Sequence, residues 1–375
     1  MQTVDRILHN GILITFNQTY QIYEPGAIAV KDNLIVAVGE EKDILADYTA
    51  REVVDCELNV IMPGLINTHT HVPMTLLRGL ADDLRLDVWL MGYMMPVERE
   101  FVTPEFVRLG TKIGCAEMIR SGVTTFADMY YFEDTIAETT AEIGMRALAG
   151  QSVMKFPSPD CDSYEDGLRL SEELIHKWKN HPTIIPSIAP HAIYTCTPEI
   201  LTAVAELAIR EDVPVQYHIA ETSSEVENAR NQYGMPVVPL AKKAGLMDTK
   251  LIGAHCVWVD EGEIRSMKNN NTGIAHNPSS NMKLASGFAP IKRMLELGCM
   301  VGIGTDGPAS NNDLDFFEEM RLASFLAKVH NADPTALPAK QVLEMGTIMG
   351  ARALHIDKIT GSLEVGKRAD MIVVD

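Results

Sequence analysis

The chain has 375 residues, of which 46% are hydrophobic and 22% charged, and its formal net charge at pH 7 is −19. This is the composition of an ordinary globular protein, long enough for one large domain with a smaller companion. The excess of acidic residues argues against a nucleic-acid partner, because nucleic-acid-binding proteins present basic patches to phosphates. The sequence contains no run of about 18 apolar residues, so we expect no membrane span.

The first residues, MQTVDRILHNGILITF, place Asp5 and His9 among apolar positions and lack the basic-then-apolar pattern of a secretory signal. We therefore expect mature sequence and a cytoplasmic location. Six cysteines are scattered along the chain without a CxxC pair, so we expect small buried thiols and no disulfide framework.

Residues 1–57 predict a small β-structure. The runs ILHNGILITF and AIAVKDNLIVAVGE alternate like antiparallel strands and are broken at turn-forming pairs such as Asn10-Gly11. The last residues, GSLEVGKRADMIVVD, return to the same pattern. We expect residues 1–57 and 359–375 to form one small β-sandwich domain. The chain stops at Asp375 inside a predicted strand, so this domain is expected to be incomplete as given.

Between these ends, short apolar runs that resemble strands alternate with helical stretches. The helical stretches include PEFVRLGTKIGCAEMIRSG (104–122) and TPEILTAVAELAIRED (197–212), each with proline near its start. Eight such strands over roughly 250 residues predict a (β/α)8 barrel over residues 58–358. A doubly wound sheet would need a glycine-rich turn after its first strand, where this chain has HTH. The eight runs are 60–67, 123–129, 145–154, 183–190, 213–220, 250–256, 272–277 and 300–306.

Six of the eleven histidines lie at the C-terminal ends of these predicted strands, and Asp306 ends the eighth strand. In a barrel those ends converge on one face. Strand alternation sends residues i and i+2 to the same side, so His69 and His71 project together. A single histidine is more often a packed residue than a ligand, but several at matching positions predict a metal site. The six are His69, His71, His191, His218, His255 and His276.

The ligand set that makes chemical sense is three imidazoles and one carboxylate, which suit Zn²⁺ or Fe²⁺ with a position left for water. Water bound to such an ion has a pKa of about 7 and provides hydroxide at neutral pH. Glu221, in HIAE, is the candidate for carrying the proton from that water to the substrate, with a solvated charge at a helix start as the alternative. His255 would orient the hydroxide or stabilise the developing oxyanion. The carboxylate ligand would also act as a base. The four ligands are His69, His71, His218 and Asp306.

The motifs PGLINTHTH, HIAE, GAHC and GTDG together resemble the amidohydrolase superfamily. Within it the chain is most similar to the 5'-methylthioadenosine/S-adenosylhomocysteine deaminases. The resemblance runs through essentially the whole chain, including APHAIYTC (189–196) and HNPSSNMKLASG (276–287). It implies hydrolytic deamination, in which hydroxide meets the adenine C6, Glu221 protonates N1 and ammonia leaves. It also implies a single metal ion, because the fourth strand ends in His191 where dinuclear relatives use a modified lysine. We expect this ion to be Zn²⁺, with Fe²⁺ and Mn²⁺ as alternatives.

The same resemblance implies the substrate contacts. Glu98 would accept two hydrogen bonds from the ribose diol, His191 would contact the nucleoside, and Trp89 would form an apolar wall. Surface charge, structural hydrogen bonding and plain packing are the respective alternatives. Arg169 matches a family arginine that would bind the amino-acid carboxylate of S-adenosylhomocysteine, with a solvated helix charge as its alternative. Gln151 stands where family members carry another arginine, so the 5'-substituent stays open among methylthio, homocysteine, hydroxyl and hydrogen.

Other reactions fit the same scaffold. Triazine chlorohydrolases have no leaving amine to protonate and often lack the glutamate after the fifth-strand histidine, so Glu221 favours a deaminase. Guanine deaminases share more of this site and stay open as an alternative. A non-catalytic metal-binding relative would have lost a ligand or the acid/base group, and here every position is filled. We expect a small-molecule nucleoside substrate, no nucleic-acid or membrane partner, and, from the resemblance, a homodimer or homotetramer.

Overall fold

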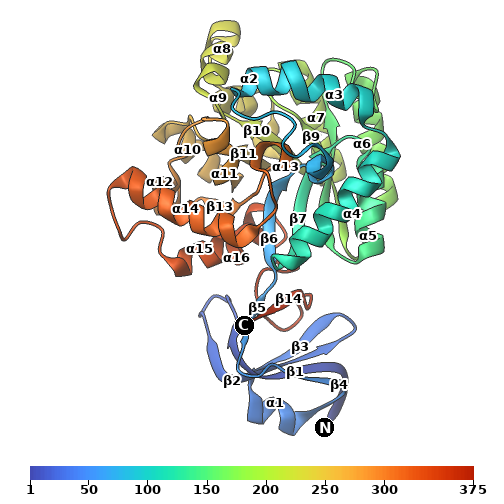
Figure 1. Cartoon of the computed structure of the whole chain (residues 1–375), viewed down its shortest axis with the longest axis vertical. Helices are drawn as coiled ribbons and strands as arrows, with labels where there is room; N and C mark the ends of the chain where they lie inside the picture. Colours follow the sequence, from blue (N-terminus) through green and yellow to red (C-terminus); the bar gives the residue numbers. More distant parts are fainter.

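The computed structural model describes all 375 residues and contains two separate sheets (Figure 1). One is a closed barrel of eight strands, and the other is a six-stranded sheet built from both ends of the chain. In Figure 1 the barrel and its helices lie above the small sheet, and both termini lie at the small sheet. The predicted (β/α)8 barrel and the separate small β-domain from both chain ends are confirmed, and the domain expected as a β-sandwich contains one six-stranded sheet.

The barrel strands are parallel and follow one another around the barrel in sequence order. They are almost entirely buried, which explains why they read as continuous apolar runs in the sequence. Their bounds are β6 (Leu65–Thr70), β7 (Val123–Tyr130), β8 (Arg146–Val153), β9 (Ile184–Pro190), β10 (Pro214–Ile219), β11 (Lys250–His255), β12 (Gly273–His276) and β13 (Met300–Ile303).

The first predicted barrel strand, 60–67, is wrong as a single element. β5 (Val60–Pro63) pairs with the small sheet, and only β6 joins the barrel. The chain passes between the two at Gly64, where a Cβ would lie 2.1 Å from Thr124 Oγ1. The domain limits 1–57, 58–358 and 359–375 stay a proposal, and the pairing of β5 favours grouping it with the small sheet.

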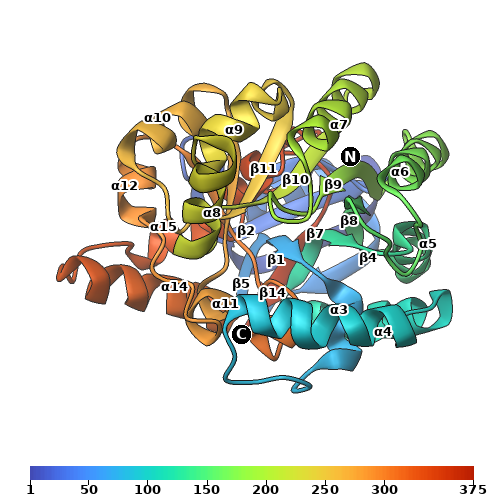
Figure 2. The same ribbon diagram turned by 90° about the horizontal axis from the view of Figure 1, so that it is seen from above.

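The predicted helices at 104–122 and 197–212 are confirmed as α4 (Pro104–Arg120) and α7 (Pro198–Glu211). Each begins after a threonine whose hydroxyl caps a free backbone N–H, and proline occupies the first turn. Figure 2 shows the helices surrounding the barrel strands. The other barrel helices are α5 (Glu133–Ile143), α6 (Tyr164–Trp178), α8 (Ser223–Tyr233), α9 (Val237–Lys243), α10 (Glu261–Asn269), α11 (Pro278–Lys283), α12 (Ile291–Glu296), α13 (Pro308–Asn311), α14 (Phe316–Asn331), α15 (Ala339–Met345) and α16 (Ile348–Ala353), with the short turn η3 (Leu246–Asp248).

The small sheet differs from the expected antiparallel hairpins in two strands, β4 (Tyr48–Asp55) and β5, which both pair parallel to β1 (Gln2–Ile14). β1, β2 (Ile22–Lys31) and β3 (Leu34–Glu40) pair antiparallel as predicted. β4 instead pairs parallel to β1, because α1 (Glu41–Asp47) carries the chain across before the strand begins. β14 (Met371–Val374) returns and pairs antiparallel with β5.

A segment between β6 and α4 packs at the C-terminal ends of the strands. It contains the 3₁₀ turn η1 (Val72–Leu77), the short helix α2 (Leu86–Val88), the π-helical turn η2 (Trp89–Met94) and α3 (Met95–Phe101). Its buried side chains form one hydrophobic cluster with residues at the end of β7. This packing fixes the segment against the strand ends.

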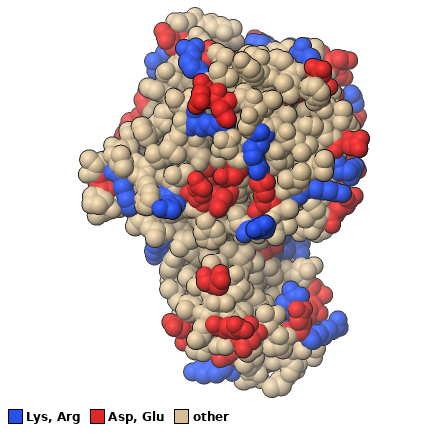
Figure 3. Space-filling model, in the orientation of Figure 1, with Lys and Arg blue, Asp and Glu red and all other residues tan.

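The remaining general expectations concern the surface and the thiols. None of the helices is both long enough and apolar enough to cross a membrane. All six cysteines are buried and free, as expected. Figure 3 shows acidic and basic side chains interspersed on the face drawn, without a continuous basic patch.

Candidate metal and active site

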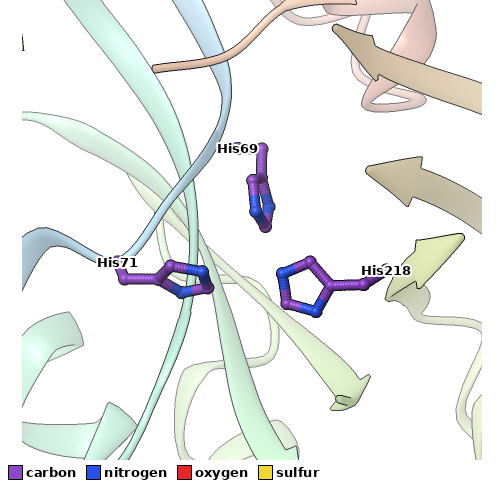
Figure 4. A group of neighbouring side chains, drawn as sticks. All are labelled: His69, His71 and His218. Carbon is purple, nitrogen blue, oxygen red and sulfur yellow. The ribbon is translucent and has the colours of Figure 1, made fainter. Parts of the chain in front are cut away.

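The strand ends bring three predicted metal ligands together. His69 lies on β6, His71 directly follows that strand, and His218 lies on β10. The ring centroid of His69 is 4.9 Å from those of both His71 and His218. In Figure 4 the three rings point toward a common centre. Their ligand atoms lie within 4.8 Å of one another, close enough to share one ion.

Asp306, which follows β13, reaches the same centre. Its Oδ1 lies 3.5 Å from His69 Nε2 and 3.2 Å from His71 Nε2. The Ser280 hydroxyl donates to its Oδ2 at 2.6 Å, and the Gly307 N–H donates to its Oδ1 at 2.7 Å. The structure therefore places the fourth predicted ligand beside the histidines and holds it there.

Backbone carbonyls set the tautomers of two histidines. His71 Nδ1 lies 2.6 Å from the Met129 carbonyl oxygen, and His218 Nδ1 lies 2.7 Å from the His191 carbonyl oxygen. Because a carbonyl only accepts, each Nδ1 carries a proton, so in the neutral ring Nε2 is the nitrogen whose lone pair can bind a metal. Metal-binding histidines are oriented in this way.

Charge and burial also fit a divalent cation. Burial lowers the pKa of His69 to about 4, and its buried Nε2 has no hydrogen-bond partner. Burial opposes protonation of His71, yet Asp306 raises its pKa to about 9. Burial would raise the pKa of Asp306, but His69 and His71 hold it well below its usual range. The buried carboxylate of Asp306 thus favours positive charge among the imidazole rings, and this set of ligand atoms suits a divalent metal.

Glu221 and His255 lie beside the cluster. Burial raises the pKa of Glu221, and the Ser286 hydroxyl donates to its Oε1 at 3.2 Å. His255 Nε2 lies 3.8 Å from Glu221 Oε2 and 3.9 Å from Asp306 Oδ2. The Nδ1 of His255 hydrogen bonds to Asn281 Oδ1 at 2.9 Å, which turns its Nε2 toward the two carboxylates. Glu221, His255 and Asp306 are therefore close enough for a proton to pass between them through a bound water or substrate.

Three of the four substrate contacts implied by the resemblance line the same pocket as these groups: Trp89, Glu98 and His191. Glu98 and Trp89 are 1% and 5% exposed, so the surface-charge alternative for Glu98 does not describe it. His191 Nδ1 lies 2.9 Å from Thr195 Oγ1. These positions leave the three side chains available to a molecule bound above the cluster.

Arg169 is not brought to the site. It lies exposed on α6, where it pairs with Glu173 at 2.8 Å and with Asp166 at 3.5 Å. The alternative reading, a solvated helix charge, describes this position. Gln151 also turns away, donating to Asp160 Oδ2 at 2.9 Å. No lysine or arginine is among the residues that line the pocket.

Several polar residues at the site were not predicted from the sequence. Tyr130 and Tyr131 lie at and just after the end of β7, and Tyr194 follows β9. The rule that singled out the histidines, polar residues at the C-terminal ends of barrel strands, could have found these three. Ser280 and Ser286 reach the carboxylates from α11 and the loop after it, and no strand pattern points to them.

Comparison with known proteins gives one consistent result. The sequence model of the Amidohydrolase family matches residues 60–375. The chain is 46% identical over 371 residues to the 5-methylthioadenosine/S-adenosylhomocysteine deaminase of Syntrophobacter fumaroxidans, covering 99% of this chain and 84% of the relative. It is 41% identical over 373 residues to the 5'-deoxyadenosine deaminase of Methanococcoides burtonii, covering 99% and 84%.

A solved structure agrees with these relatives. The crystal structure of an adenosine deaminase from Xanthomonas campestris with bound zinc superposes with a TM-score of 0.97 and 39% identity. The alignment covers 100% of this chain and 85% of that one. Sequence and architecture therefore point to the same group of proteins.

Proposed function

The chain belongs to the amidohydrolase family, and on this premise we propose that it is a metal-dependent deaminase of adenosine-type nucleosides. It hydrolyses the C6–N bond of the adenine ring and releases an inosine analogue and ammonia. Its substrates belong to the group that contains 5'-methylthioadenosine, S-adenosylhomocysteine, adenosine and 5'-deoxyadenosine. The observation that carries this proposal is the placement of Glu221 and His255 around a buried cluster of three histidines and an aspartate.

The metal would be held by His69, His71, His218 and Asp306. When bound, it lowers the pKa of water so that a nucleophile forms near neutral pH. We propose Zn²⁺, because three imidazoles and one carboxylate suit it and because a similar deaminase structure contains zinc; Fe²⁺ and Mn²⁺ are the alternatives.

The residues of the chain move the protons. His255 Nε2 faces both carboxylates, so it can hold the attacking water by a hydrogen bond and stabilise the oxygen that develops on C6. Glu221 takes one proton from the water and delivers it to N1 of the ring. Asp306 takes the second proton, which passes to the exocyclic amine. The C6–N bond then breaks, a C6 carbonyl remains and ammonia leaves.

Substrate binding would use other residues that line the same pocket. We propose that Glu98 accepts hydrogen bonds from the ribose diol, while His191 and Trp89 contact the nucleoside. The lining contains no lysine or arginine, so the proposal includes no charged contact to a 5'-carboxylate. A cytoplasmic location and a homodimeric or homotetrameric assembly remain predictions from sequence and resemblance.

A substrate panel tests the reaction. Purified protein is mixed with adenosine, 5'-deoxyadenosine, 5'-methylthioadenosine, S-adenosylhomocysteine and guanine, and the absorbance change from adenine to hypoxanthine or from guanine to xanthine is followed. We expect turnover of adenosine derivatives and none of guanine. Absence of turnover across every adenosine derivative would refute the proposal, and turnover of guanine alone would favour a guanine deaminase.

Metal removal tests the cofactor. Elemental analysis is expected to find zinc in the active protein, and a chelator is expected to abolish turnover until Zn²⁺ is restored. Recovery with Fe²⁺ or Mn²⁺ but not Zn²⁺ would correct the identity of the ion. Full activity without any metal would remove the basis of the mechanism.

A further inference from the structure

The hydroxyl groups of Tyr130 and Tyr131 contact the carboxylate of Glu98, which lines the pocket. We propose that Tyr130 and Tyr131 are positioning residues that orient Glu98 for a vicinal diol and thereby make the enzyme selective for ribonucleosides. This inference rests on the proposed function, because it concerns how the ribose of that substrate is recognised. It adds two residues that neither the sequence motifs nor the resemblance singled out.

The contacts divide between the two carboxylate oxygens. Tyr130 Oη donates to Glu98 Oε1 at 2.7 Å, and Tyr131 Oη donates to Glu98 Oε2 at 3.3 Å. The two rings pack against each other with centroids 4.8 Å apart. Both tyrosines are buried and line the pocket beside Glu98. The carboxylate is therefore held at both oxygens by a rigid aromatic pair.

Glu98 depends on these donors because it lacks a stronger partner. It is 1% exposed and forms no ion pair with lysine, arginine or histidine within 4.0 Å. Burial raises its pKa, while the hydrogen bonds from Tyr130 and Tyr131 and the charge of His71 act in the opposite direction. An ionised carboxylate in such a place needs hydrogen-bond donors to offset lost hydration. The tyrosines supply two of them.

The remaining acceptor capacity suits a diol. A carboxylate offers about four lone-pair positions on two oxygens, and the tyrosines use one on each oxygen. One free position on each oxygen is left for a second donor. Two neighbouring hydroxyl groups, such as the 2'- and 3'-hydroxyls of ribose, would fill both at once. A substrate that lacks them leaves the buried carboxylate less satisfied, which disfavours its binding.

The contact also joins two parts of the chain. Glu98 lies on α3, in the segment between β6 and α4, whereas the tyrosines lie at the end of β7. Apart from packing, the hydroxyls thus fix the angle at which α3 presents its carboxylate to the barrel. Removal of one hydroxyl leaves the ring and its packing in place but frees one carboxylate oxygen.

The test compares Tyr130→Phe and Tyr131→Phe with wild type on two kinds of substrate. For adenosine, KM is expected to rise about tenfold in Tyr130→Phe, the size of effect that one hydrogen bond to a charged group produces, with kcat little changed. The rise is expected to be smaller in Tyr131→Phe, because its hydrogen bond is 0.6 Å longer (3.3 against 2.7 Å). With 2',3'-dideoxyadenosine, each variant is expected to match wild type.

Two further variants separate positioning from structure. In a Glu98→Gln background, the Tyr130→Phe change is expected to add little to KM, since the charge it orients is gone. Tyr217→Phe removes a buried hydroxyl that has no partner and lies outside the pocket, and it is expected to leave KM for both substrates unchanged.

The possible outcomes are distinct. An equal loss on adenosine and dideoxyadenosine would mean that the tyrosines serve only the fold, and no change on adenosine would refute the inference outright. If wild type deaminates neither substrate nor any other adenosine derivative, the proposed function itself fails, and this inference fails with it.

Discussion

Glu221 owes its chemical character to its surroundings. It follows β10 at the buried floor of the pocket, where burial raises its pKa and the Ser286 hydroxyl holds one carboxylate oxygen. His255 faces the other oxygen at 3.8 Å. A general acid works best when its pKa approaches the working pH, and burial moves a glutamate in that direction. Histidines lower the pKa of the neighbouring Asp306, which suits the two carboxylates to the separate roles proposed for them.

The Glu221→Gln variant tests the proton-transfer role. The amide has the same size but cannot carry a proton to N1, so kcat is expected to fall by about 10²- to 10⁴-fold. Metal content, measured by elemental analysis, is expected to equal that of wild type. Glu206→Gln changes an exposed glutamate on α7 and serves as the control. Native turnover by Glu221→Gln with its metal in place would refute the role.

A second buried glutamate, which does not line the pocket, couples stability to pH. Burial raises the pKa of Glu319 from 4.5 to about 8, and Asp313 adds to this rise, although Asn311 and Ser279 donate hydrogen bonds to the carboxylate. A folded-state pKa above the unfolded value means that the native state favours the protonated form. The resulting stability is present below pH 4.5 and is lost as the pH rises through about 8.

The Glu319→Gln variant mimics the protonated form at every pH. Relative to wild type, its free energy of unfolding is therefore expected to be higher at pH 9 than at pH 5, as measured by denaturant titration. Glu318→Gln, which changes the exposed neighbour, is expected to show no such pH-dependent difference. An equal difference at the two pH values would show that Glu319 ionises normally in the folded protein.

At the level of elements, two of the barrel strands are short, and one of them depends on close contact with a helix. β12 and β13 have four residues each. β12 begins at Gly273, where a Cβ would lie 1.9 Å from the Ala353 carbonyl oxygen at the end of α16. Only a residue without a side chain lets α16 pack this closely on the strand. The position of His276, at the other end of β12, follows from that contact.

The Gly273→Ala variant is expected to be destabilised by about 1–3 kcal/mol or more, because the added methyl group must displace backbone. Thermal unfolding followed by circular dichroism measures the loss. Gly39→Ala in β3 is the matched control, since its Cβ would meet nothing nearer than Ile44 Cδ1 at 4.0 Å. If both variants unfold at the same temperature, the approach of α16 does not constrain β12.

For the whole molecule, the candidate site and the contact between the two sheets lie at opposite ends of the barrel. The site occupies the C-terminal ends of the strands, whereas the small sheet meets their N-terminal ends (Figure 1). Arg146, at the start of β8, is 5% exposed and pairs with Asp370, just before β14, through contacts of 2.8 and 3.2 Å. Its Nη1 also donates to the Pro182 carbonyl oxygen. This ion pair ties the returning chain end to the barrel.

The Asp370→Asn variant leaves a buried guanidinium without its anion and is expected to lower the free energy of unfolding by about 1.5–3 kcal/mol. The turnover rate per folded molecule is expected to stay unchanged, because the Arg146–Asp370 ion pair does not line the pocket. Glu52→Gln breaks the exposed pair with Arg6 and is expected to cost less than about 1 kcal/mol. Similar losses in both variants would show that burial does not strengthen the Arg146 pair.

Much of the fold and the cluster of three histidines and an aspartate could be predicted from local sequence patterns. The apolar runs of β7 to β13 mark buried parallel strands, because both faces of each strand are covered. Their number and alternation with helices predicted the barrel. The position of each histidine at a strand end then predicted that they would meet, since parallel strands of a barrel end on one face.

The sequence by itself thus determined the barrel, its strand ends and the cluster of three histidines and an aspartate, because periodicity and chain order encode burial and direction. Only the tertiary structure decided the sheet that β5 joins, the direction of β4, the exposure of Arg169 and the contact of Tyr130 with Glu98. Each of these depends on which distant segment supplies a partner. A local pattern states that a group is buried or polar, but the packed chain determines what it touches.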